Sequence, residues 1–161
     1  MLRYIGVICI FIFTFYVVFV YERYQKRSLL QGEEFLLFLK MLLDELQGMG
    51  RSPAECVRSF RAPALEKTAF LRELSQGNPP HAAYRSARDA LCLPHGMDRV
   101  LDETFENFGR GARREECRRI SDAAMRAEAL LETERQEHTR RLTLCRTLAT
   151  ASAMGLVILL M

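Results

Sequence analysis

The chain has 161 residues, of which 23 are Lys or Arg and 20 are Asp or Glu, so its formal net charge is +3. Arg3 is the only charged side chain outside residues 22–146, so that segment carries 22 basic residues (23 minus Arg3) and 20 acidic ones. A balance this even lacks the basic footprint of a nucleic-acid-binding protein. The length suits one modest domain.

The first predicted element is residues 4–21, a run of 18 residues without a charge that is rich in Ile, Val and Phe. Hydrocarbon offers the backbone no hydrogen-bond partners, so such a run is expected to be a transmembrane helix. A cleaved signal peptide would need small residues at its cleavage site, and a lipoprotein site at Cys9 would need one just before it, where Ile8 stands. We therefore predict a retained N-terminal transmembrane helix over residues 1–21.

A basic stalk over residues 22–32 is expected next, followed by a helical bundle over residues 33–131. The first bundle helix is predicted for about residues 33–47, because apolar side chains recur there at steps of four and three. These side chains are Phe35, Leu39, Leu42, Leu46 and Met49. Gly48 and Gly50 end the pattern.

Proline and glycine divide the rest of the bundle. Ser52 and Glu55 form a capping box that predicts the start of a second helix. A third helix is expected to begin at Pro63 and run through Leu74, a fourth to follow the 77–80 turn, and a fifth to follow the 94–96 break. No run of alternating apolar and polar residues indicates a strand, so the predicted fold class is all-α, with about six bundle helices.

The last predicted helix is the longest. Between Gly111 and Gly155 there is no Gly or Pro, so one helix is expected from about residue 112 to residue 160, continuous into the membrane. Residues 132–141 contain no apolar side chain and are expected to form a solvated, charged stalk. Residues 142–161 give about 30 Å of helix, one bilayer core, which predicts a C-terminal transmembrane helix.

The distribution of Lys and Arg predicts the topology. The inner flanks of the two spans carry the basic residues Arg23, Lys26, Arg27, Arg140, Arg141 and Arg146. By the positive-inside rule, a two-pass protein of the cell membrane with a cytoplasmic central domain is expected. The five cysteines include no C-x-x-C pair and are interpreted as reduced thiols.

No constellation of residues indicates an enzyme. His81, His95 and His138 lack metal-ligand spacing. The segment Gly109–Gly111 begins like a dinucleotide-binding loop, but it lacks a third glycine and follows no strand. A membrane enzyme would need clustered polar groups inside the bilayer, and the predicted spans contain only scattered Tyr, Thr and Ser. We therefore expect no catalytic residue, cofactor or metal.

Two groups of residues are candidate contact sites. Five arginines crowd the start of the long helix: Arg110, Arg113, Arg114, Arg118 and Arg119. Glu115 can pair with either of the last two, whereas Arg110, Arg113 and Arg114 have no evident helical partner. Those three are interpreted either as a solvated face near acids of another helix or as a docking patch for an acidic partner. On the docking interpretation, reversing their charge is expected to leave the fold intact.

The second candidate group consists of small residues four apart in the C-terminal span: Ala149 with Ala153, and Ala151 with Gly155. Such pairs let helices approach closely in lipid. The alternative is that Ala and Gly are simply common in membrane helices.

Three short motifs carry a resemblance to a known family. They are Ser52-Pro53-Ala54 at a helix start, the pair Phe108-Gly109, and the tail 155–161. In these motifs and in its layout the chain resembles the stage III sporulation protein AB family of endospore-forming bacteria. The chain departs from the family pattern in a shorter loop after Gly109 and in the sequence Glu115-Glu116-Cys117.

The resemblance implies a function. The family is similar to the cytoplasmic domain of the F component of type II secretion and pilus platforms. This implies a non-enzymatic inner-membrane platform on the mother-cell side of a sporulation-specific channel complex, which couples a cytoplasmic secretion-type ATPase to the membrane assembly. The implied partners are other membrane proteins of the complex, the ATPase and the lipid bilayer, with no nucleic acid. The alternative is a membrane-tethered helical adaptor or signalling module unrelated to secretion.

Overall fold

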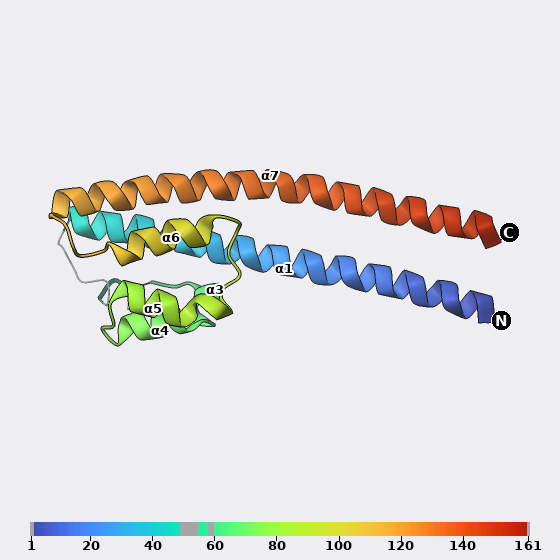
Figure 1. The fold of residues 1–161 in the computed structure, drawn as a ribbon, viewed down its shortest axis with the longest axis horizontal. Helices are drawn as coiled ribbons and strands as arrows, with labels where there is room; N and C mark the ends of the chain where they lie inside the picture. Colours follow the sequence, from blue (N-terminus) through green and yellow to red (C-terminus); the bar gives the residue numbers. More distant parts are fainter. Residues whose placement is uncertain (1, 49–54, 58–59, 161) are drawn as a thin grey trace. The chain divides into compact units, whose positions relative to one another are not determined.

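The computed structural model describes residues 2–48, 55–57 and 60–160, and all the secondary structure in these residues is helical (Figure 1). The predicted all-α fold class is therefore confirmed. The side chains of some residues within the two longest helices lie outside the description: 2–11, 14, 142, 146, 149–150, 153–154 and 156–160. The predicted capping box at Ser52 and the apolar residue Met49 also lie outside the described residues.

The chain divides into two compact units. One unit contains residues 1–26 and 135–161, which are helical segments from the two ends of the chain. The other contains residues 27–134 and is a helical bundle.

Two long helices extend through both units, α1 (Leu2–Gln47) and α7 (Arg113–Leu160). The single long helix predicted for residues 112–160 is confirmed, because nothing between Gly111 and Gly155 interrupts α7. The helix predicted for residues 33–47 ends where expected, but it is the last part of α1 and not a separate element. Gly32 does not break α1; a Cβ atom built there would lie 2.7 Å from Leu131, so the glycine allows close packing.

Short helices fill the chain between them: α3 (Pro63–Glu66), α4 (Ala69–Ser75), α5 (Pro80–Ala87), the 3₁₀ helix η1 (Arg88–Ala90) and α6 (Met97–Glu106). The prediction of one helix from Pro63 through Leu74 is wrong. The Thr68 hydroxyl donates to the Leu65 carbonyl (2.7 Å) and accepts from the Phe70 N–H (3.4 Å). A side chain that bonds the backbone in this way ends one helix and caps the next.

Side chains of α1 fix the loops of the bundle. The Glu34 carboxylate accepts hydrogen bonds from the Ala64 and Leu65 N–H groups (2.9 and 2.7 Å), which are free donors at the start of α3. The buried Gln31 side chain accepts from the Cys92 N–H (2.7 Å) and so holds the loop before α6.

The bundle core is an aromatic cluster. Its fully or almost fully buried members are Phe35, Phe38, Phe70, Tyr84 and Phe105. Ring centroids lie 5.0 Å apart for Phe35 and Phe70, and 5.4 Å apart for Tyr84 and Phe105. These are favourable distances for tilted aromatic pairs. The cluster thus joins α1 to α4, α5 and α6.

The unit formed by residues 1–26 and 135–161 leaves large apolar side chains exposed. They are Ile12, Phe13, Phe15, Tyr16, Val17, Phe19, Val20, Tyr21, Tyr24, Leu144 and Leu148. In the part of the chain that the structure describes, no helix contains an apolar stretch long enough to cross a membrane.

Candidate functional site

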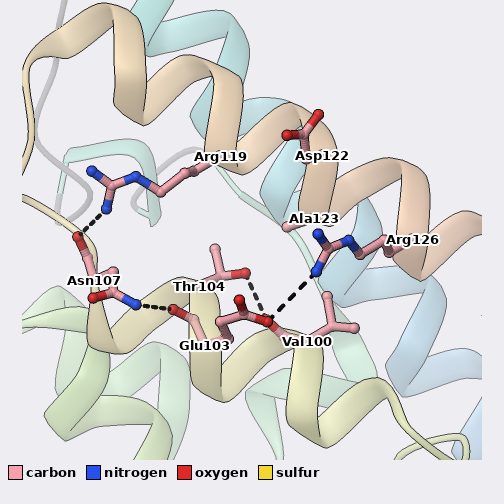
Figure 2. Close-up of a pocket in the computed structure, with 8 residues that line it drawn as sticks. All are labelled: Val100, Glu103, Thr104, Asn107, Arg119, Asp122, Ala123 and Arg126. Carbon is pink, nitrogen blue, oxygen red and sulfur yellow. Dashed lines mark hydrogen bonds and ion pairs between the residues drawn. The ribbon is translucent and has the colours of Figure 1, made fainter.

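A groove of about 100 Å³ lies between α6 and α7 (Figure 2). Its lining is mostly polar: Val100, Glu103, Thr104, Asn107, Arg119, Asp122, Ala123 and Arg126. Among the described residues, this groove is a candidate site for a small ligand.

The polar groups of the groove bind one another across the two helices. Arg126 forms an ion pair with Glu103 (3.5 Å), and Arg119 donates to the Asn107 carbonyl (3.1 Å). The Asn107 amide donates back to the Glu103 carbonyl (3.0 Å). Figure 2 shows that Asp122 points away from these groups. The arrangement joins α6 to α7 and satisfies the donors that a bound anion would need.

The turn between α6 and α7 is held by one buried carboxylate. Glu116 is 6% exposed and accepts from the N–H groups of Gly109 and Gly111, both at 3.1 Å. Arg119 approaches Glu116 at 3.8 Å and Glu115 at 3.3 Å. The predicted pairing of Glu115 with Arg119 is confirmed.

Gly109 has a structural reason. Its φ is +80°, a conformation that disfavours residues with a side chain. A Cβ atom at Gly111 would meet only the flexible end of the Arg119 side chain, which would have to shift. The Phe108-Gly109 motif therefore marks a turn that Glu116 closes. Sequence reasoning missed Glu116, although its place in the first turns of a helix after Gly-x-Gly was an available signal.

Arg113 has a partner within the bundle. Its guanidinium donates to the carbonyls of Leu46 and Gly48, with the second bond at 2.8 Å. These carbonyls belong to the end of α1, where helix carbonyls lack intrahelical donors and a positive charge is favourable. Arg113 therefore has a partner that its neighbours in the sequence did not indicate, because the fold brings the end of α1 to the start of α7. Its role as a docking residue stays a prediction.

The other predicted docking residues remain available. Arg110 and Arg114 are exposed, and Arg118 is exposed one turn beyond Arg114. Among the described residues, none of these three guanidinium groups makes a hydrogen bond or an ion pair. In the described residues around the start of α7, the arginines without a hydrogen bond or an ion pair are therefore Arg110, Arg114 and Arg118.

The small residues of the C-terminal segment are only partly described. Ala151 and Gly155 are exposed, and a Cβ atom at Gly155 would meet no described atom within 4 Å. The side chains of Ala149 and Ala153 lie outside the description. Close packing through these residues stays a prediction.

Titratable groups form no metal centre in the described residues, where no cluster of three His, Cys, Asp or Glu side chains could hold an ion. Cys92, Cys117 and Cys145 are free thiols. Burial raises the pKa of the Tyr84 phenol well above its ordinary value, and the nearby Asp102 and Asp98 carboxylates raise it further. Because Tyr84 lies in the aromatic core, this shift reports on packing.

Comparison with known proteins identifies the family. Residues 3–161 match the family described as stage III sporulation protein AB. The match covers nearly the whole chain, so the chain belongs to this family, and the resemblance in the sequence is confirmed. No curated protein and no solved structure matches the chain.

Proposed function

We propose that this member of the stage III sporulation protein AB family is a non-enzymatic, membrane-anchored platform in a sporulation-specific, secretion-like channel complex. In this role it couples a cytoplasmic ATPase to the membrane assembly. The observation that carries the proposal is the division of the chain into a closed bundle and a helical unit with uncovered apolar side chains.

The anchoring part of the proposal rests on the sequence and on exposure. Residues 4–21 are uncharged, and most of the large side chains of α1 between Ile12 and Tyr21 are exposed. An apolar helix surface of this kind is stable when lipid surrounds it. The basic residues at 23–27 and 140–146 support a cytoplasmic bundle, on the mother-cell side, with both chain ends across the membrane.

The platform part rests on how the bundle is built. Its core is made by its own helices, and ion pairs join those helices at the surface, such as Lys40 with Glu128 (3.2 Å) and Arg85 with Glu106 (3.5 Å). A bundle tied in this way suits the transmission of force or position between a motor and a membrane channel. The absence of a catalytic motif from the sequence is consistent with this role.

Topology is tested with reporters in cells of a sporulating bacterium. A reporter fused after Met161 is expected to be reached by a membrane-impermeant reagent, whereas Cys92 and Cys117 are expected to be protected from it. The two-anchor arrangement is wrong if the C-terminal reporter is protected and the bundle cysteines react.

The partners are tested by purifying the full chain from sporulating cells in detergent and identifying bound proteins by mass spectrometry. Small membrane proteins of one complex together with a secretion-type ATPase are expected. Deletion of the chain is expected to block sporulation. Purification with signalling proteins alone would favour the adaptor or signalling module over the platform.

A further inference from the structure

We propose that Arg110, Arg114 and Arg118 form a docking surface, here called the arginine face, for an acidic segment of a partner protein. This inference rests on the proposed platform function and adds to it the surface and the chemistry of the contact.

The arginine face differs from most other basic groups of the bundle because, among the described residues, its guanidinium groups form no ion pair, although Glu115 and Asp122 lie within four residues of Arg118 on α7. Arg85 pairs with Glu106, Arg88 with Asp98 and Asp102, Arg119 with Glu115, and Arg126 with Glu103. Arg113 binds the carbonyls at the end of α1. Within the described residues, three guanidinium groups with no side-chain interaction thus occur within nine positions, at the start of α7.

The backbone under the arginine face is fixed. Glu116 holds the N–H groups of Gly109 and Gly111, and Arg113 ties the first turn of α7 to α1. The arginines therefore project from an ordered scaffold, which lowers the entropy lost when a partner binds.

The charge of the arginine face indicates the charge of the partner that it binds. The first turn of α7 already contains Glu115 and Glu116, which compensate the partial positive charge of the helix start. The attraction for a partner therefore comes from the unpaired guanidinium groups of the arginine face. Their charge favours an anionic partner.

An exposed apolar side chain indicates that the anion belongs to a protein. Met125 is 59% exposed and lies seven residues after Arg118, which is two turns along the same face of α7. Asp122 lies between Arg118 and Met125 on this helix. A partner segment with acidic residues one helical turn apart, then a basic or polar residue and then an apolar one, matches this order. Exposed methionine is common at protein-binding surfaces.

A membrane surface fits less well. Thirty-three residues separate Arg114 from Thr147, where the uncharged C-terminal run begins, which is about 50 Å along a helix. Attraction to lipid headgroups decays over a Debye length of roughly 8 Å at physiological salt.

The test measures binding of the full chain, purified in detergent, to a fluorescent helical peptide. The peptide carries Glu at four-residue spacing and a Leu beyond the acidic part, and its control carries Gln in place of Glu. The Glu peptide is expected to bind with an affinity that falls with salt, and the Gln peptide is expected to bind at least tenfold more weakly. Equal binding of both peptides would overturn the proposal.

Matched variants locate the contact. The double variant R114E/R118E is expected to lose at least tenfold in affinity for the Glu peptide and to gain affinity for a Lys version of the same peptide. The control R61E/R99E reverses two other exposed arginines, and its affinity is expected to stay within about twofold of the wild type. Unchanged thermal unfolding of both variants excludes misfolding; the proposal is refuted if both variants lose the same affinity.

Cellular readouts separate this inference from the proposed function. R114E/R118E is expected to lose the cytoplasmic partner in co-purification and to block sporulation, while R61E/R99E does neither. If R114E/R118E keeps the partner and sporulates, the arginine face is wrong and the platform stands. If the wild-type chain itself brings down no channel protein, the platform is wrong. Weaker binding of R114E/R118E than of R61E/R99E to phosphatidylglycerol vesicles, with equal binding of both variants to the Glu peptide, would assign the arginines to lipid and would also overturn the proposal.

Discussion

Phe35 and Phe15 lie on the same helix, α1, but in different units, and their surroundings are opposite. Phe35 is fully buried and contacts three other aromatic rings, whereas Phe15 is 69% exposed. The bundle of residues 27–134 covers its large apolar side chains with its own short helices. The unit of residues 1–26 and 135–161 has only two helical segments with which to cover its apolar side chains.

This difference indicates which contacts stabilise each unit. A buried apolar side chain stabilises the fold by about 1.5–3 kcal/mol relative to an exposed one. The bundle gains this within the chain; on the proposed function, the helical unit gains it from lipid. Substitutions of the same kind should therefore have different effects in the two units.

The largest expected effect is in the aromatic core. Phe105→Ala is expected to lower the free energy of unfolding by about 3–5 kcal/mol, because Phe105 contacts four rings of the cluster and its loss leaves a cavity. Phe15→Ala is expected to change it by less than about 0.5 kcal/mol. Urea unfolding in detergent, followed by circular dichroism, measures both, and similar losses would contradict the comparison.

The next effect concerns the turn before α7. Glu116→Ala removes the acceptor for two backbone N–H groups and is expected to cost about 1–3 kcal/mol. Glu115→Ala is the control, because the Glu115 side chain is largely exposed, and it is expected to cost less than about 1 kcal/mol. Hydrogen exchange at the amides of Gly109 and Gly111 should accelerate in the first variant only.

A pH effect of similar size is expected from Tyr84. Its pKa is raised in the folded state, so the neutral phenol is favoured by folding, and stability is present below pH 10 and is lost above it. At pH 11, one unit above the ordinary value, the loss is about 1.4 kcal/mol. Thermal unfolding between pH 9 and pH 11 checks this, and Tyr84→Phe should remove that part of the slope.

The smallest effect distinguishes the two neighbouring arginines. Arg113→Ala is expected to cost about 0.5–1.5 kcal/mol, because it frees the Leu46 and Gly48 carbonyls at the end of α1. Arg114→Ala is expected to have almost no effect on stability and to weaken partner binding instead. If both variants unfold at the wild-type temperature, the assignment of Arg113 to the fold is incorrect.

Helix boundaries were predictable where a local signal decides them. The end of α1 at Gln47 coincides with Gly48 and Gly50, and α7 runs from Arg113 to Leu160 through a stretch with no Gly or Pro before Gly155. Gly32 and Gly155 interrupt neither helix. The break at Thr68 was not predictable in the same way. A threonine inside an apolar pattern does not by itself indicate a helix end. The break depends on the hydrogen bond from its hydroxyl to the Leu65 carbonyl, which only the structure shows.

The sequence predicted where the candidate site lies in the chain, but not which of its arginines have partners in the fold. Sequence placed the uncompensated arginines at the start of the long helix because charge and order along the chain are visible there. It could not assign Arg113, since the Leu46 and Gly48 carbonyls lie more than sixty positions away in the chain.

The sequence by itself determined the all-helical class, the long helix α7, the charge distribution and the family, because periodicity, glycine placement and charge are local properties. It did not show that α1 is one continuous helix. The tertiary structure alone decided which charges are paired. Phe38 and Glu116 gained their roles in the same way, as a core ring and as the carboxylate that closes a turn. The physical reason is that burial and hydrogen bonding depend on groups that folding brings together from distant positions.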